Sequence, residues 1–454
     1  MILPPLSELL CADGDARILA GPDGRNRYGR TVTPSADLAF GSSTASSISQ
    51  GAWEAVAVRR DVWLSDGRAP DAVFADTADA IRERFAAHYG LRDTAIILTP
   101  SGTDAHLLAA LLLAGPHEAP LACLSVEPSE TGSGAPLALA VRRFAGDGGV
   151  LSYGDRAETI AIPARDPDGN VRPQDEVMAD LDALISACDR EGRQALLVAT
   201  DVSKTGLIAP EPQTVRALKA RWHARLDVLI DACQLRLSPI SLRAWLDQGC
   251  LVAVTGSKFV GGPAFSGMLL VPAAIAKRLR RRTLPHLPEL GHAAMWPEGF
   301  AARDACSGQP TFGLLARWEA ALFEMDRFFA VDEAHLTQIT RELSAGLEAR
   351  LMASSVLTYM PSPPLHRSTS GWDGIATILP FKPDRAYASL KGLEIGQSVQ
   401  IGGAKALRLC LSMPLIVQAA GSDASLRAVL FEGVAAIAVI ETATQTLASR
   451  RQAG

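Results

Sequence analysis

Between residues 95 and 271 the sequence alternates short apolar runs with helical stretches, and this alternation constrains the fold more than any other feature. The apolar runs have the length of buried strands and lie at 95–99, 120–125, 195–200, 227–230, 251–254 and 267–271. The helical stretches lie at 104–114, 175–189, 213–222 and 241–247. Strands that alternate with helices build a mostly parallel sheet with helices on both faces. The sequence therefore predicts an α/β domain.

The same pattern divides the 454 residues into four parts. Residues 1–75 are rich in Gly, Ser, Asp and Arg and predict an N-terminal arm without regular structure, with a helix beginning near Asp76. Residues 76–285 form the large α/β domain, and 286–340 supply connecting helices and an interface. Residues 341–454, with strands expected at 374–379 and 406–412 and a helix at 423–444, form a small α+β domain.

Composition narrows the class of ligand. The formal net charge of −5 leaves no excess of positive charge for nucleic acid or anionic lipid. The seven cysteines contain no C-x-x-C pair, and the histidines lack metal-ligand spacing, which predicts reduced thiols and no metal. No apolar run approaches the ~20 residues that a membrane span requires. We therefore expect a cytoplasmic enzyme with a small-molecule substrate and no nucleic-acid or membrane partner.

Three of the expected strands end in residues that carry chemistry, and ligands of open α/β sheets bind at the carboxyl ends of the strands. Ser101-Gly102-Thr103 opens a helix, where backbone N–H groups and the helix dipole favour a phosphate. Asp231 ends a buried strand, where a carboxylate requires a cationic partner. Lys258 follows another strand, where desolvation lowers a lysine pKa and favours Schiff-base formation. The alternatives are a plain N-cap for Ser101, a helix cap for Asp231 and a surface charge for Lys258.

Taken in order, the segments Ser101-Gly-Thr, Asp231-Ala-Cys-Gln234 and Thr255-Gly-Ser-Lys258 resemble those of fold-type I pyridoxal-phosphate enzymes. The resemblance is to the class V aminotransferase group, which includes cysteine desulfurases and kynureninase, and it extends from about residue 77 to residue 412. It implies a fold-type I architecture, in which a large domain with a mostly parallel seven-stranded sheet between helices joins a small α+β C-terminal domain.

The resemblance also implies residue roles. Lys258 holds pyridoxal 5′-phosphate as a Schiff base, the internal aldimine, and then moves the substrate α-proton through a quinonoid intermediate. Asp231 pairs with the pyridinium nitrogen, and Gln234, joined by Ser203, hydrogen-bonds the phenolic oxygen of the ring. The full set implied to bind the cofactor is Ser101, Gly102, Thr103, Thr131, Ser203, Asp231, Gln234, Thr255, Ser257, Lys258, Gln309 and Thr311.

Two further implied sites concern the substrate and the neighbouring subunit. Arg408 lies in a strand-like run where the family keeps an arginine that binds the substrate α-carboxylate, and an ordinary edge-strand charge is the alternative. The segment 307–311, with Gln309 and Thr311, resembles the one by which a neighbouring subunit completes the phosphate site. The resemblance therefore implies a homodimer with active sites at the subunit interface.

The sequence also departs from the family. The loop 126–134 has no His or aromatic residue to cover the cofactor ring, so that Thr131, Glu130 or His106 would have to do so. No cysteine stands between Cys306 and Cys410, which disfavours the persulfide chemistry of a desulfurase. The expected function is an aminotransferase acting on an amino acid or related primary amine. The alternatives are a β/γ-lyase and, ranked lower because Lys258 and Asp231 are present, a catalytically silent relative.

Overall fold

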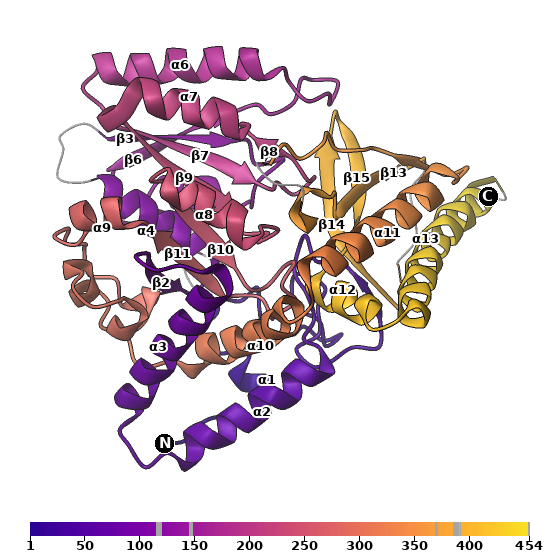
Figure 1. The fold of residues 1–454 in the computed structure, drawn as a ribbon, viewed down its shortest axis with the longest axis horizontal. Helices are drawn as coiled ribbons and strands as arrows, with labels where there is room; N and C mark the ends of the chain where they lie inside the picture. The colour runs from indigo at the N-terminus through magenta and orange to yellow at the C-terminus, as the bar shows by residue number, and fades with distance from the viewer. Residues whose placement is uncertain (115–119, 145–148, 368–370, 385–389, 391, 453–454) are drawn as a thin grey trace.

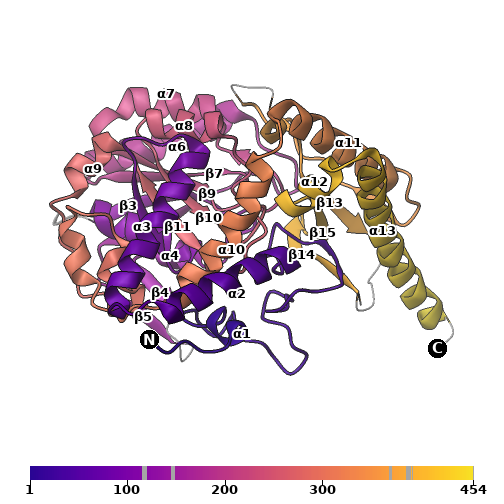
Figure 2. The same ribbon diagram turned by 60° about the horizontal axis from the view of Figure 1, so that its bottom comes forward.

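The protein is described by a computed structural model that covers residues 1–454 apart from 115–119, 145–148, 368–370, 385–389, 391 and 453–454. The structure contains a large α/β part and a smaller part, built mainly from residues 333–452, which run from orange to yellow in Figure 1. The N-terminal chain runs along both, which Figure 2 shows from below.

The large part is built on a sheet with the strand order β2-β11-β10-β9-β7-β3-β6, to which the short β8 adds by pairing with β7. Four neighbouring pairs, from β10 to β6, are parallel, and β11 is antiparallel to both β2 and β10. The strands are β2 (Ala95–Thr99), β3 (Leu121–Val126), β6 (Ala157–Ile162), β7 (Ala195–Asp201), β8 (Ile208–Ala209), β9 (Leu226–Ala232), β10 (Leu251–Thr255) and β11 (Gly267–Val271). The mostly parallel seven-stranded sheet that the resemblance implied is confirmed, and β6, which no apolar run predicted, is its seventh strand.

Helices cover this sheet because their apolar residues recur at helical spacing. α4 packs on β10 and β11, and nearly all of its residues are buried, as its Ala/Leu-rich sequence requires. α6 packs on β7, α7 packs on β9, and α2 and α3 both pack on α10. The helices of the large part are α1 (Leu6–Leu9), α2 (Gln50–Ser65), α3 (Pro70–Tyr89), α4 (Gly102–Ala114), α5 (Ala135–Leu139), α6 (Gln174–Arg190), α7 (Pro212–Trp222), α8 (Pro239–Asp247), α9 (Ala273–Leu279) and α10 (Phe312–Phe329), and a hairpin of β4 (Arg142–Phe144) and β5 (Val150–Ser152) is attached.

The smaller part is a five-stranded sheet with the order β1-β14-β15-β13-β12, packed with three helices. Its elements are β1 (Leu38–Phe40), α11 (Glu333–Met352), β12 (Leu357–Tyr359), β13 (Ile378–Pro383), β14 (Leu393–Ile401), β15 (Ala404–Cys410), α12 (Met413–Ala420) and α13 (Asp423–Gln452). The strands expected at 374–379 and 406–412 are displaced by two to four residues, and β12 and β14 were not expected. β14 carries polar residues at four of its nine positions, two of them consecutive and exposed at Gln397 and Ser398, so that its apolar signal is weak.

The first 75 residues are more regular than the sequence indicated. They contain α1, β1, α2 and the first turn of α3, which begins at Pro70 and not near Asp76. Proline at the first helical position is favourable because its missing N–H would have no helical partner there. β1 pairs in parallel with β14, so that the arm supplies an edge strand to the sheet of the smaller part.

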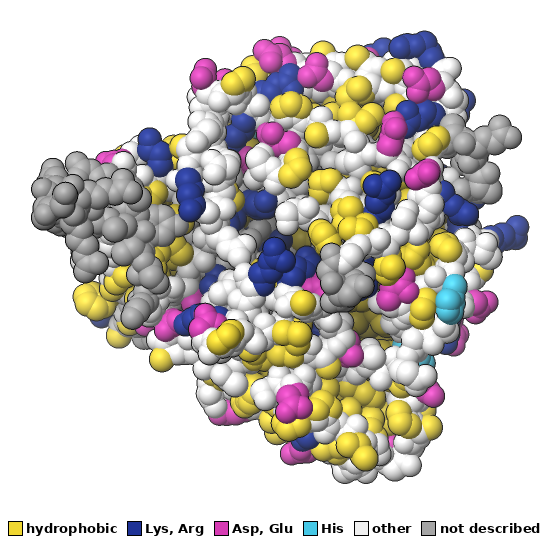
Figure 3. All heavy atoms as spheres, turned by 180° about the vertical axis from the view of Figure 1, so that it is seen from behind, with side chains coloured by type: hydrophobic (Ala, Val, Ile, Leu, Met, Phe, Trp, Pro, Cys, Tyr) yellow, Lys and Arg dark blue, Asp and Glu magenta, His cyan; other side chains and the backbone are white. Residues whose placement is uncertain are grey.

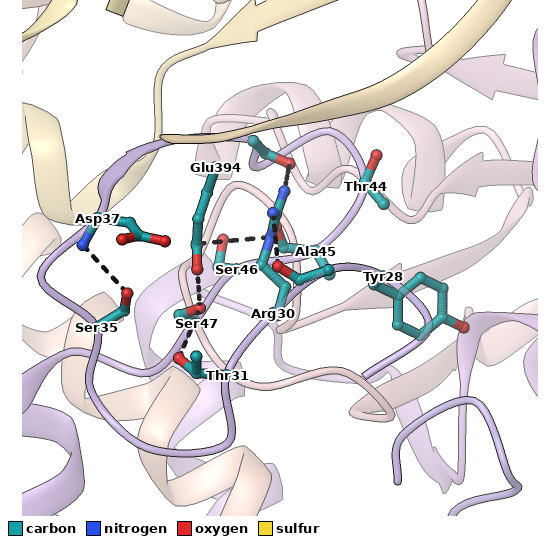
Figure 4. Close-up of polar contacts among 12 residues, drawn as sticks. Tyr28, Arg30, Thr31, Ser35, Asp37, Thr44, Ala45, Ser46, Ser47 and Glu394 are labelled. Carbon is teal, nitrogen blue, oxygen red and sulfur yellow. Dashed lines mark hydrogen bonds and ion pairs between the residues drawn. The ribbon is translucent and has the colours of Figure 1, made fainter. Parts of the chain in front are cut away.

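Buried polar contacts fasten this arm to β14 (Figure 4). Arg30 Nε donates to the Ala45 carbonyl at 2.8 Å and lies 3.7 Å from Glu394 Oε2. Ser47 Oγ donates to Glu394 Oε1 at 2.6 Å. Arg30 and Glu394 are both buried, so that each charge requires the other and the surrounding carbonyl and hydroxyl groups. The arm is therefore an integral part of the fold.

The charged side chains on the surface do not mark a binding face. On the face shown in Figure 3, Lys and Arg side chains are interspersed with Asp, Glu and apolar side chains, and no field of one charge sign covers it. Among the described helices, none combines the length and the apolar character that a bilayer crossing would require.

Candidate active site

The carboxyl ends of β9 and β10 bring Asp231 and Lys258 into one neighbourhood. Asp231 lies next to Ala253 of β10 in the parallel ladder, and Lys258 stands three residues beyond the end of that strand. Lys258 is half-buried, and its positive charge contributes to lowering the pKa of Asp231. The two residues that the sequence singled out are thus electrostatically coupled.

Asp231 is buried against a histidine. His106 Nε2 lies 3.4 Å from Asp231 Oδ2, an ion-pair distance longer than a normal hydrogen bond, and the Cys233 backbone N–H donates to Asp231 Oδ1 at 3.1 Å. Burial alone would raise the pKa of Asp231, but the His106 charge, the Lys258 charge and the Cys233 N–H hold it well below its ordinary value. Burial would lower the pKa of His106, and the Asp231 carboxylate raises it. Each group thus favours the charged form of the other, and His106 Nδ1 donates to the Gly102 carbonyl at 2.6 Å.

The first turn of α4 forms a cradle of small and hydroxyl residues. Ser101 caps the helix, because its Oγ accepts from the Asp104 N–H at 3.2 Å and donates to Asp104 Oδ2 at 2.7 Å. Gly102 has no room for a side chain, since a Cβ there would lie 2.6 Å from Cys233 Sγ and 2.8 Å from Thr255 Cγ2. Ser101 is therefore an N-cap residue. The same helix start could also bind a phosphate, because the first N–H groups of a helix have no helical acceptors.

Hydroxyls from β10 complete the cradle. Thr255 Oγ1 donates to the Cys233 carbonyl at 2.6 Å, and Ser257 Oγ donates to Thr255 Oγ1 at 3.3 Å, a long bond that a stronger acceptor could replace. Thr103 is half-buried and faces Gly134, whose Cβ position is 3.2 Å from Thr103 Oγ1. The loop after β3 therefore reaches the start of α4.

Gln234 presents an unpaired acceptor. Its Nε2 donates to the Ser43 carbonyl at 2.9 Å, whereas its Oε1 is buried without a partner among the described residues. The chain turns sharply after it: the Leu235 N–H donates to the Ala232 carbonyl at 2.7 Å, and Leu235 has a φ of 50°, which is rare for a non-glycine residue. A strained turn of this kind is retained where a side chain has to be aimed.

The Ser203 hydroxyl is fully hydrogen-bonded within the protein. Its Oγ donates to Glu130 Oε2 at 2.6 Å and accepts from the N–H groups of Thr205 and Leu207 at 3.2 and 3.0 Å, which fills its capacity. Glu130 is itself buried and paired with Arg165 at 2.7 Å. Glu130 and Ser203 are therefore engaged with each other, and the ring-oxygen role considered for Ser203 has no donor left to perform it.

Of the three residues considered for covering the ring, only Thr131 remains without a strong partner. Its Oγ1 makes one long contact, 3.4 Å, to the Glu127 carbonyl, and the residue is buried. His106 is held beside Asp231, and Glu130 is held by Arg165. His286 is exposed, and His292 lies 3.3 Å from Asp71 of α3, so that neither belongs to the strand-end cluster.

Arg408 is buried in β15 without an acidic partner among the described residues. Its Nη1 donates to the Lys204 carbonyl at 3.0 Å and its Nη2 donates to Thr44 Oγ1 at 3.2 Å and to the Gln397 carbonyl, while Nε has no partner. Burial lowers the pKa of Arg408. Arg408 is an interior residue of a central strand, so that the alternative of an edge-strand charge is not supported.

Sequence reasoning missed two contributors to this cluster. The first is the arm segment 42–46: Ser46 Oγ donates to the Lys258 carbonyl at 2.9 Å, and Ser42 Oγ donates to the Leu411 carbonyl at 2.6 Å. Its serine-rich sequence is typical of an exposed loop, and no local signal shows that it is buried. The second is Lys204, in the loop after β7, whose position beside Arg408 depends on long-range packing.

Gln309 and Thr311 lie just before α10 on a separate cavity of about 140 Å³. That cavity is also lined by Asp13, Glu289 and Pro100, the last of which precedes Ser101 in sequence. Because Pro100 lines the same cavity, Gln309 and Thr311 lie near the first turn of α4 of their own subunit. Asp13 joins the arm to α10 by accepting from the Gly313 N–H at 3.0 Å. Among the described residues, no cluster of three or more His, Cys, Asp or Glu side chains could hold a metal ion.

No protein-family model and no curated protein matches the sequence. Solved structures do. The chain is 15% identical to the cysteine desulfurase CsdA from Escherichia coli, with 89% of this chain and 96% of that chain covered and a TM-score of 0.57. It is 14% identical to the cystine C–S lyase C-DES, solved with its reaction product cysteine persulfide, with coverages of 88% and 97% and a TM-score of 0.58.

A cysteine desulfurase from Thermococcus onnurineus NA1 gives similar values, with 14% identity, coverages of 88% and 94% and a TM-score of 0.57. At such identities the likeness bears on the fold. It confirms the architecture that the sequence resemblance implied. The chain thus has the fold of the fold-type I pyridoxal-phosphate enzymes, in the form found in these desulfurases and this lyase.

Proposed function

We propose that this protein is a pyridoxal 5′-phosphate-dependent enzyme that acts on an amino acid or related primary amine, in the first place as an aminotransferase. One observation carries the proposal: a half-buried lysine and a buried, ionised aspartate meet at the carboxyl ends of adjacent parallel strands of a fold-type I sheet. The structural neighbours support it, because a C-DES variant was solved with glycine covalently linked to its PLP cofactor.

The residues present fit this cofactor. The first turn of α4, with Ser101, Gly102 and Thr103, would hold the phosphate together with Thr255 and Ser257. Asp231 would face the ring nitrogen. The Gln234 Oε1, buried and unpaired, would accept from the phenolic hydroxyl. Gly102 adds support of another kind, because its close packing on Cys233 and Thr255 excludes any side chain from the cradle.

When bound, pyridoxal phosphate supplies an aldehyde that condenses with amines and a ring that accepts the electron pair released at the substrate α-carbon. Lys258 would hold the aldehyde and, once released from it, take the proton from the α-carbon as general base. Asp231, kept ionised by His106, would hold a proton on the ring nitrogen. Arg408 would orient the substrate by its α-carboxylate, and the arm at Ser46 would hold the Lys258 backbone in place.

A lyase that breaks a bond at the β or γ carbon is the second candidate, and the likeness to the cystine C–S lyase favours it. A desulfurase that forms a protein persulfide is less well supported. All described cysteines are buried except Cys11, which is intermediate, and burial raises the pKa of Cys11, Cys123, Cys188, Cys233, Cys250 and Cys306. A buried thiol of raised pKa is a poor nucleophile.

The proposal includes a cytoplasmic homodimer, with Gln309 and Thr311 reaching the phosphate site of the partner subunit. Their place beside Pro100 is compatible with a contact to the own or the partner cradle. Light scattering of the purified protein tests the dimer. Titration of Gln309→Ala with cofactor tests the crossing contact, because replacing a residue that reaches the partner's phosphate site should weaken cofactor binding without changing the fold.

The central test is the cofactor attachment. Purified protein is incubated with pyridoxal phosphate, reduced with borohydride and digested, and the modified peptide is identified by mass spectrometry. We expect the label on Lys258 and no label on that peptide in Lys258→Ala; Lys277→Met, a change at an exposed lysine of α9, serves as the control. Labelling elsewhere, or no labelling, contradicts the proposal. Mixing the enzyme with excess amino donor then separates the two reactions. Transfer stops after one equivalent of keto acid per enzyme, whereas elimination continues and releases ammonia.

A further inference from the structure

Lys204 brings an additional positive charge to this cluster. Its backbone is fixed at both ends, because its N–H donates to the Glu130 carbonyl at 2.8 Å and its carbonyl accepts from Arg408 Nη1 at 3.0 Å. Its Nζ donates to the Pro128 carbonyl at 2.9 Å, and the side chain is half-buried. The ammonium therefore lies against the loop after β3, while the backbone carbonyl of the same residue contacts the buried Arg408 guanidinium of β15, whose charge also acts on the ammonium.

The acids near Lys204 are already committed. Four charged groups face it: Arg408 from β15, Lys258 after β10, Glu130 after β3 and Asp231 at the end of β9. Glu130 is paired with Arg165 at 2.7 Å, and Asp231 is paired with His106. Among the described residues, neither Lys204 nor Arg408 forms an ion pair. The fold thus holds two neighbouring cations without a counter-charge.

Such an arrangement is unfavourable in the free protein. Burial, followed by the Arg408 and Lys258 charges, lowers the pKa of Lys204 to about 8, and burial lowers the pKa of Arg408. Cations that repel one another in a partly desolvated site gain from any anion that enters it, because the anion restores the lost solvation and cancels the repulsion. One α-carboxylate on Arg408 supplies a single negative charge and leaves Lys204 unmatched.

From this geometry we propose that the substrate carries a second anionic group on its side chain, a carboxylate, and that Lys204 is the residue that binds it. This inference rests on the proposed function, in which Arg408 takes the α-carboxylate. The substrate class is then an acidic amino acid. Lys204 acts as a specificity-determining residue, and its own N–H and carbonyl contacts keep it beside Arg408 whatever its side chain.

Anion binding by the protein itself tests the inference. The probes are succinate, with two carboxylates, and butyrate, with one, and their dissociation constants are measured by calorimetry with cofactor-loaded and cofactor-free protein. We expect succinate to bind at least tenfold more tightly than butyrate at pH 7. Lys204→Met should reduce that ratio to near one, Lys204→Arg should keep most of it, and Lys277→Met should leave it unchanged.

The pH profile of the wild type gives a measurement that needs no variant. Lys204 is protonated below its pKa, so the preference for succinate should be full near pH 7 and should decline as the pH rises past about 8, a midpoint that the bound anion itself moves upward. In the wild type, the preference for aspartate or glutamate over alanine in kcat/KM should decline over the same pH range.

Any of three binding results overturns the inference: no preference for succinate in the wild type, a preference that Lys204→Met leaves intact, or a preference independent of pH between 7 and 10. A change in the cofactor absorbance of Lys204→Met with unchanged selectivity also overturns it, because Lys204 would then face the cofactor. Failure of the proposed function is distinguishable, since it appears as missing label on Lys258, whereas succinate binding by the cofactor-free protein is measured independently.

Discussion

Replacing His106 tests how the buried carboxylate is kept charged. In His106→Leu, Asp231 loses the imidazolium that lies 3.4 Å from it and keeps only the Cys233 N–H at 3.1 Å as a direct partner. Removing one member of a buried ion pair leaves an uncompensated charge and costs about 3–5 kcal/mol. The free energy of unfolding of the cofactor-free protein should fall by this amount, measured by urea unfolding with tryptophan fluorescence.

The pH dependence supplies a second, independent prediction. The folded state raises the pKa of His106 from its ordinary 6.5 because of Asp231, although burial opposes the shift. The stabilisation is therefore complete below about pH 6.5 and is lost as the pH rises through the raised pKa of the folded state. The difference between wild type and His106→Leu should be largest near pH 6 and should shrink at alkaline pH.

Two matched variants isolate the charge. His106→Gln can still donate a neutral hydrogen bond toward Asp231 and should recover about 2 kcal/mol of the loss, since hydrogen bonds to charged groups contribute ~1.5–3 kcal/mol. His335→Leu removes a histidine whose Nε2 contacts the Ala420 carbonyl at 3.1 Å and should show no comparable change. Bound cofactor should reduce the His106→Leu loss by giving Asp231 a second cationic partner. A loss below about 1 kcal/mol in the cofactor-free protein, or one that does not shrink with pH, would refute this account.

Other variants address the remaining parts of the site. Asp231→Asn should leave cofactor binding largely intact but slow α-proton exchange of the substrate by several orders of magnitude, followed by NMR in deuterated water; a near-normal rate would remove its role at the ring nitrogen. Gly102→Ala should weaken cofactor affinity measured by fluorescence titration, because the new methyl would lie 2.6 Å from Cys233 Sγ, whereas Gly67→Ala, with open space around it, should not. Equal affinities in the two glycine variants would show that the cradle does not include α4.

Much of the large sheet is predictable because its information is local. β2 and β11 begin and end at the expected residues, and the other predicted strands differ by a residue or two, since each is a short apolar run with helical sequence on either side. The smaller part was harder to predict. β14 has no continuous apolar face, and β1 pairs with it from more than 350 residues away.

The amino-acid sequence by itself determined which side chains stand at the ends of the strands, and hence that Ser101, Asp231 and Lys258 would share one edge of a parallel sheet. Only the tertiary structure decided their partners. It places His106 beside Asp231 and the arm serine Ser46 on the Lys258 loop, and it pairs Ser203 with Glu130, so that the Ser203 hydroxyl has no hydrogen left to donate. The physical reason is that strand and helix periodicity is written into neighbouring residues, whereas a buried charge is satisfied by whichever group the packing brings to it, however distant in the chain.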